Sequence, residues 1–123
     1  MALQESGEMY LATIYVLSKE KLIVRGIDIS EYMGYTKPSV SRGIGLLRKE
    51  GLIDKDEYGG VVLTKEGEKI AKRIYERHTV LSELFKNIGV DEKTATEDAC
   101  RVEHYISDTT FNAIKEHMKK LTS

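Results

Sequence analysis

The chain has 123 residues, of which 41% are hydrophobic and 32% charged, and a formal net charge of −1 at pH 7. This size and composition predict one small folded domain, or one domain with an appendage, and no stretch approaches the roughly 18 consecutive apolar residues of a membrane span. The single cysteine excludes an internal disulfide, and the first ten residues have neither the basic nor the apolar run of a signal peptide. We therefore expect a protein of the reducing cytoplasm without a membrane partner.

The first third of the chain has the pattern of a helix-turn-helix. Apolar residues recur at helical spacing over residues 8–20, and a short helix over residues 27–33 ends at Gly34. Thr36 then provides an N-cap, and Pro38 is tolerated in a first helical turn. A short helix, a tight turn and a second helix together make this DNA-binding motif.

The second helix of the motif, over residues 39–49, is basic on its outward side. No acidic residue occurs between Glu31 and Glu50, whereas four cationic ones do: Lys37, Arg42, Arg48 and Lys49. In DNA-binding proteins of this type the N-terminal residues of such a helix meet base edges in the major groove. The alternative is an ordinary helix pair with a solvated basic face.

Two glycines interrupt this helix. Gly43 and Gly45 each cost up to about 1 kcal/mol relative to alanine in a helix interior. A close helix–helix contact, or close approach to a phosphate backbone, would explain them, and the sequence leaves both explanations open.

A β-hairpin follows the basic helix. Residues 51–55 and 60–64 are two short β-rich runs, and the segment between them leads into a glycine pair. A hairpin directly after a recognition helix is typical of the wing of a winged helix, and Lys55 is placed to rest on the sugar–phosphate backbone.

The remaining residues predict helices only. A long amphipathic helix runs from Lys65 to about Asn87, and the next helix carries residues 100–105. The expected stops and caps are Gly89, Asp91, and Ser107 or Asp108. The tail exceeds what a winged helix needs for its own core, so its spare apolar surface predicts a homodimer interface.

Cys100, Glu103 and His104 are spaced for metal binding. On a helix, positions i, i+3 and i+4 share one face, with Cβ atoms roughly 5–6 Å apart. A sulfur, an oxygen and a nitrogen donor form most of a transition-metal site. The alternatives are an inert, buried Cys100 beside solvated neighbours, and an enzyme with Cys100 as nucleophile and His104 as base, for which no oxyanion-hole loop is evident.

These residues belong to a wider resemblance to the DtxR/MntR family, the metal-dependent repressors of the diphtheria toxin repressor and manganese transport regulator type. The segments that carry it are Glu8–Tyr15, Thr36–Ser41, Leu63–Gly67, Arg77–His78, Ile88–Asp91, Asp98–His104 and Ser107–Asp108. The resemblance implies a mainly α fold: a winged helix-turn-helix DNA-binding domain with a two-stranded wing over residues 1–64, and a helical metal-binding and dimerisation domain over residues 65–123.

By this resemblance the primary metal ligands are Met9, Cys100, Glu103 and His104, and His78 is retained from a second metal site. Met9 on an apolar helix face would otherwise be interpreted as core filler. An ion bound by both halves of the chain would fix the angle between them. In a homodimer on a palindromic operator in double-stranded DNA, that angle sets the separation of the recognition helices, about 34 Å. Metal and DNA binding then become reciprocal.

The resemblance also bears on which metal activates the repressor. Manganese-type members carry carboxylates where this chain has Met9, Ala12 and Cys100, so the ligands follow the iron-type pattern, whereas the length to Ser123 is that of the manganese type. Thiolate and thioether suit softer ions than Mn²⁺. We expect Fe²⁺ as effector with Mn²⁺ second, and binding of Co²⁺, Ni²⁺ or Zn²⁺ in vitro. A manganese-sensing member and a winged-helix regulator that does not respond to metal are the alternatives.

For DNA, the resemblance implies base-reading or base-adjacent roles for Thr36, Pro38 and Arg42. The residues expected on phosphates are Arg25, Lys37, Ser39, Ser41, Arg48 and Lys49. Arginine can bind guanine O6 and N7 with two hydrogen bonds, so Arg42 is the expected specificity determinant. The predicted function is a metal-activated repressor of metal-uptake genes.

Overall fold

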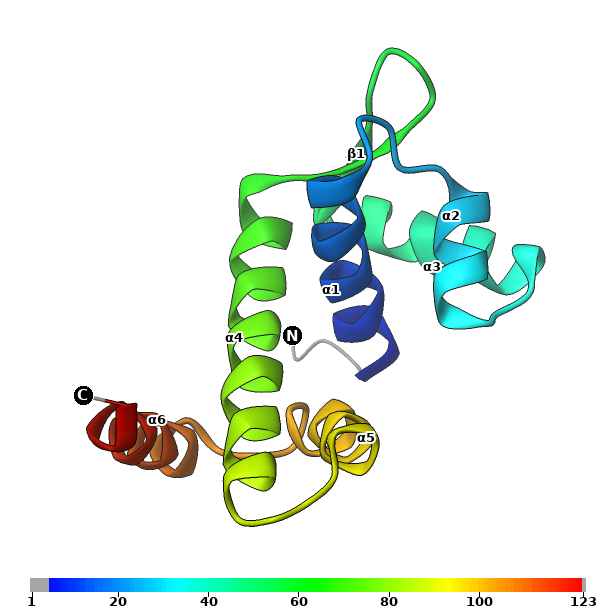
Figure 1. Ribbon diagram of the computed structural model, residues 1–123. Helices are drawn as coiled ribbons and strands as arrows, with labels where there is room; N and C mark the ends of the chain where they lie inside the picture. The colour runs from blue at the N-terminus through cyan, green and yellow to red at the C-terminus, as the bar shows by residue number, and fades with distance from the viewer. Residues whose placement is uncertain (1–4, 123) are drawn as a thin grey trace. The chain divides into compact units, whose positions relative to one another are not determined.

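The computed structural model describes residues 5–122, so the ends of the two predicted domain ranges, residues 1–4 and Ser123, lie outside it. Over the described residues the chain forms six helices and one two-stranded sheet (Figure 1). In order these are α1 (Glu5–Glu20), α2 (Gly26–Met33), α3 (Lys37–Lys49), β1 (Ile53–Lys55), β2 (Val61–Leu63), α4 (Lys65–Asn87), α5 (Glu92–Val102) and α6 (Asp108–Thr122). The predicted mainly α fold with a helix-turn-helix and a two-stranded wing is confirmed.

The chain divides into two compact units, the first ending at Lys72 and the second beginning at Arg73. The predicted domain boundary after residue 64 stays a prediction. No helix within residues 5–122 is both long and apolar enough to cross a membrane.

The turn of the helix-turn-helix is built by local hydrogen bonds. Gly34 ends α2 in the left-handed conformation, with φ 73° and its N–H bonded to the carbonyl of Ser30 at 2.9 Å. The hydroxyl of Thr36 accepts a hydrogen bond from the Ser39 N–H at 3.3 Å and so caps α3. Both predicted signals are confirmed, although α3 begins two residues earlier than expected.

The core of the first unit joins all of its elements. Leu11 and Ile14 on α1, Ile29 on α2 and Val40 on α3 are at most 1% exposed. The hairpin is antiparallel, with Ile53 opposite Leu63. This core holds α3 with its basic side in solvent.

The second unit confirms the predicted helix ends and caps but corrects the predicted end of one helix. As predicted, Gly89 follows the end of α4 with φ 106°, Asp91 caps α5, and Ser107 accepts a hydrogen bond from the Thr110 N–H at the start of α6. The helix expected to carry residues 100–105, however, ends at Val102. The backbone then tightens, with the Tyr105 N–H bonded to the Val102 carbonyl at 3.0 Å.

Candidate metal centre and DNA-binding face

Three donor side chains of different type converge in the second unit. His78 comes from α4, Cys100 from α5, and Glu103 from the turn after α5, and their donor atoms all lie within 4.8 Å of one another. The Nδ1 atom of His78 is 3.0 Å from Oε2 of Glu103 and 3.7 Å from Sγ of Cys100. The cluster thus joins segments that are 22 and 25 residues apart.

The second oxygen of Glu103 faces His104. Its Oε1 atom lies 3.5 Å from Nε2 of His104, and the two side chains are only 6% and 2% exposed. Glu103 therefore lies between two imidazoles, one on each carboxylate oxygen. Three of the five predicted ligands, His78, Cys100 and Glu103, have their donor atoms within 4.8 Å of one another. His104 lies beside this cluster through its contact with Glu103.

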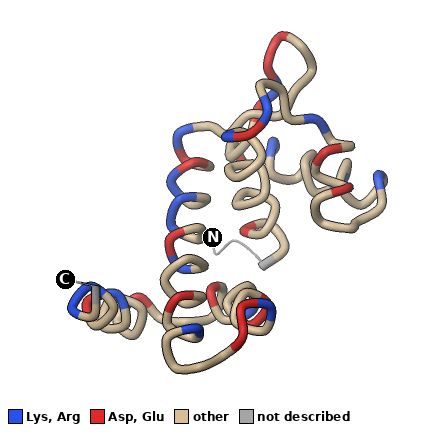
Figure 2. Tube along the Cα trace, viewed as in Figure 1, with Lys and Arg blue, Asp and Glu red and all other residues tan. Residues whose placement is uncertain are grey.

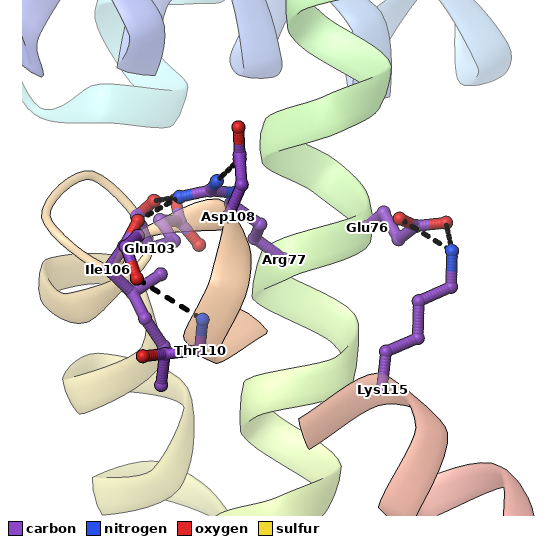
Figure 3. A network of polar contacts seen from close by, with 8 residues as sticks. Glu76, Arg77, Glu103, Ile106, Asp108, Thr110 and Lys115 are labelled. Carbon is purple, nitrogen blue, oxygen red and sulfur yellow. Dashed lines mark hydrogen bonds and ion pairs between the residues drawn. The ribbon is translucent and has the colours of Figure 1, made fainter. Parts of the chain in front are cut away.

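Arg77 fixes the backbone of the turn that carries Glu103 and His104. Its guanidinium donates to the carbonyls of Glu103 at 3.3 Å and Ile106 at 2.6 Å, and it pairs with Asp108 at the start of α6 (Figure 3). The Arg77 side chain is only 7% exposed and its guanidinium lies over the ring of Phe111, 5.3 Å from the ring centre. Because these carbonyls accept hydrogen bonds from Arg77, they do not accept the main-chain N–H groups that would extend the helix. This explains why α5 ends at Val102.

A further contact ties α4 to α6. The ammonium of Lys115 lies 3.1 Å from both carboxylate oxygens of Glu76, as the dashed lines in Figure 3 show. This pair is solvent-exposed, so it adds less to stability than the buried Arg77 does.

The electrostatics of the cluster favour a cation. The neighbouring Cys100 and Glu103 raise the pKa of His78 to about 10, with Cys100 as the larger cause. A site that holds a proton this firmly surrounds a position where positive charge is favoured. The donors present, an imidazole, a thiol and a carboxylate, fit a divalent transition metal, which would displace protons on binding.

The fifth predicted ligand lies in the other unit. Met9 is on α1, where its side chain is half-buried. Its role as a metal ligand stays a prediction.

The predicted DNA-contacting residues lie around α3 and its flanks. Lys37, Pro38, Ser41, Arg42, Arg48 and Lys49 are all exposed, and so is Arg25 just before α2. The first turn of α3 contains no acidic residue, and its last turn contains Arg48 and Lys49. This arrangement suits the phosphate backbone.

Two of these predicted contacts already have local partners. The hydroxyl of Thr36 donates to the Ser39 hydroxyl at 2.9 Å while accepting from the Ser39 N–H. Arg48 lies 3.8 Å from Asp54 on the wing. Asp56 and Glu57 follow β1 in the hairpin loop, and the loop at the top of Figure 2 is red over part of its length. Lys55 is the one cationic residue between residues 51 and 64.

Sequence reasoning missed the roles of Arg77 and Tyr10. Arg77 occupies a buried position on α4 three residues after the buried Ile74. A cation at a position in the apolar stripe of the predicted helix could have indicated a buried, hydrogen-bonded arginine. Tyr10 donates its hydroxyl to the Ser39 carbonyl at 3.3 Å, linking α1 to α3; nothing in its spacing pointed to that contact.

Two family descriptions cover nearly the whole chain. The iron dependent repressor N-terminal DNA binding domain matches residues 2–61, and the iron dependent repressor metal binding and dimerisation domain matches residues 64–123. The chain belongs to the iron dependent repressor family. It is therefore a metal-dependent transcriptional regulator that binds DNA and forms homodimers, and the resemblance to the DtxR/MntR family is confirmed.

Individual relatives agree with this assignment. The HTH-type transcriptional regulator MntR of Bacillus subtilis is 36% identical over 109 residues, which cover 89% of this chain and 77% of that protein. An HTH-type transcriptional regulator of Methanocaldococcus jannaschii is 32% identical over 120 residues, covering 96% of each. The solved structure of the manganese regulator SloR matches 97% of this chain with a TM-score of 0.82 at 28% identity, and the chain spans 55% of its length.

Proposed function

We propose that the protein is a cytoplasmic repressor of metal-uptake genes, which binds a palindromic operator when it holds Fe²⁺, with Mn²⁺ as the second candidate. The observation that carries this proposal is the convergence of nitrogen, sulfur and oxygen donors from His78, Cys100 and Glu103 in a chain whose other half is a winged helix. A bound divalent ion would supply concentrated positive charge at this cluster. Linkage then makes metal affinity and DNA affinity reciprocal.

The proposed ligands are Cys100, Glu103, His104 and Met9, with His78 beside the same ion. The contacts of His78 with Cys100 and Glu103 support this placement over a separate second site. Glu103 can serve as an oxygen donor while its other oxygen orients an imidazole, an arrangement that fixes the ring and its tautomer.

The choice between iron and manganese rests on Cys100. A thiolate favours softer ions than Mn²⁺, which prefers oxygen donors. The relatives that are named as manganese regulators keep Mn²⁺ as the second candidate. Affinity in vitro does not decide the matter, because Co²⁺, Ni²⁺ and Zn²⁺ are expected to bind at least as tightly as Fe²⁺.

The proposal is tested by anoxic titration of a fluorescent duplex, selected by the protein from a random library, with Fe²⁺, Mn²⁺ or chelator present. We expect Fe²⁺ to raise DNA affinity and chelator to reverse the effect. His78→Ala and Cys100→Ser should lose the activation, whereas His117→Ala, an exposed histidine on α6, should keep it. Equal DNA affinity with Fe²⁺ and with chelator would instead indicate a regulator that does not respond to metal.

We also infer that Cys100 is not the nucleophile of an enzyme with His104 as its base. Family members are transcriptional regulators, and Cys100 has metal-type donors around it. Alkylation of Cys100 by iodoacetamide should slow when Fe²⁺ or Mn²⁺ is added. Fast alkylation that metal does not affect would contradict its role as a ligand.

A further inference from the structure

The two glycines inside α3 have different surroundings. A Cβ atom on Gly43 would lie 2.5 Å from Cε2 of Tyr10, so a side chain at residue 43 would require the buried Tyr10 ring to move. A Cβ atom on Gly45 would meet nothing within 4 Å, and Gly45 is not among the described glycines with positive φ. Glycine in a helix interior is unfavourable relative to alanine, and neither packing nor backbone conformation in the described part of the chain accounts for it at residue 45.

Gly45 lies in the wall of an open groove. The groove has a volume of about 450 Å³ and lies between the start of α2, α3 and the hairpin. Its charged lining residues are all basic, namely Lys37, Arg48 and Lys55. Ser41 and Arg48 share the side of α3 on which Gly45 lies, because they are four residues before it and three after it.

A second hollow of the first unit is chemically different. It has about the same size, 480 Å³, but its lining mixes lysines with Asp56 and Glu68. Its Lys72 already pairs with Glu68 at 3.0 Å, and its Lys21 pairs with Asp28 at 3.2 Å. Of the two hollows, the groove beside Gly45 has no acidic lining residue, although its Arg48 lies 3.8 Å from Asp54 on β1. Its charge is therefore the one that suits a polyanion.

We propose that Gly45 is the point of close approach between α3 and one sugar–phosphate strand of the operator, and that its missing side chain keeps the groove open for that strand. The inference rests on the proposed DNA-binding function. It adds to the predicted DNA-contacting residues one that has neither a charge nor a hydrogen-bonding side chain. Ser41 and Arg48 reach phosphate oxygens of the same strand, while Gly45 lets the helix backbone come near enough for them to do so.

Gly45→Ala tests this proposal, because it separates stability from DNA binding. The melting temperature of the variant should equal or exceed that of the wild type, since the added methyl enters open space and alanine favours the helix. Its affinity for DNA in the presence of Fe²⁺ under anoxic conditions should fall about tenfold or more, the loss expected when a charge-assisted contact is displaced. The loss should be similar for the selected duplex and for a random duplex, because phosphate contacts carry no sequence information.

A control variant and a modified duplex complete the test. Gly43→Ala, the same substitution on the core side of α3, should lower the melting temperature. Replacing single phosphates of the selected duplex by neutral methylphosphonates should identify a position that weakens the wild type but not Gly45→Ala. Wild-type DNA affinity in Gly45→Ala, a lowered melting temperature, or a loss confined to the selected duplex would overturn the proposal. If the wild type binds neither duplex with metal present, the proposed function fails instead.

Discussion

The ring of Tyr10 occupies the space that a side chain at residue 43 would need. A Cβ atom on Gly43 would lie 2.5 Å from Cε2 and 2.7 Å from Cζ of that ring, and the Tyr10 hydroxyl bonds to the Ser39 carbonyl. Burial, the largest cause, raises the pKa of Tyr10. The helix that carries Met9 is thus packed directly on the backbone of the proposed recognition helix.

This contact predicts that Gly43→Ala destabilises the protein by about 1–3 kcal/mol, the usual effect of overpacking a core. Urea denaturation followed by circular dichroism measures the change. Gly45→Ala is the control, because its methyl group meets open space. Equal stability of Gly43→Ala and wild type would mean that Tyr10 can leave its position at no cost.

Arg77→Ala should lower the free energy of unfolding by about 2–4 kcal/mol, because it removes buried donors from two carbonyls and leaves them unsatisfied. It should also weaken metal binding, since the turn that carries Glu103 and His104 loses its support. Thermal denaturation and Zn²⁺ titration measure the two effects. Arg101→Ala, which removes only an exposed pair with Asp98, should change stability by less than about 0.5 kcal/mol.

Asp91 should stabilise α5 in a pH-dependent way. The Thr94 N–H, 3.0 Å from its carboxylate, holds the pKa of Asp91 below the ordinary value of 3.8. A folded-state pKa below the unfolded one gives stability that is present above about pH 4 and is lost as the pH falls through the lower value. Asp91→Ala should therefore lower the melting temperature at pH 7, and the difference from wild type should shrink towards pH 3. A constant difference would indicate that the carboxylate charge contributes nothing.

Arg42 and Lys49 should affect DNA binding differently. Arg42→Ala should cost about 1–3 kcal/mol in operator affinity and relax specificity at one base position, whereas Lys49→Ala should weaken all duplexes equally and reduce the salt dependence. Affinities for the selected duplex and its single-base variants, measured at several salt concentrations, distinguish the two. Equal losses on selected and random DNA for Arg42→Ala would assign it to phosphate contact instead.

The sequence predicted those features that depend on near neighbours. Gly34, Thr36 and Asp91 end or begin helices through bonds that span three or four residues, so spacing alone reveals them. The length of the helix from Lys65 to Asn87 was likewise visible in its apolar stripe.

Features that depend on distant contacts could not be predicted in this way. The helix after Asp91 stops early because Arg77, on another helix, takes up the carbonyls that follow it. His78 meets Cys100 and Glu103 only once three segments have packed together, so spacing suggested His104 as their partner and gave no geometric reason to add His78. The reasons for Gly43 and Gly45 differ, although the sequence presents the two residues alike.

Arg77 and main-chain hydrogen bonds hold the backbone of the turn after α5. A substitution of Glu103 or His104 would therefore keep the main-chain carbonyls that Arg77 binds while altering the donor atoms of the cluster. The metal preference of the cluster can therefore be altered by single substitutions at these two positions without removing the Arg77 contacts that shape the turn.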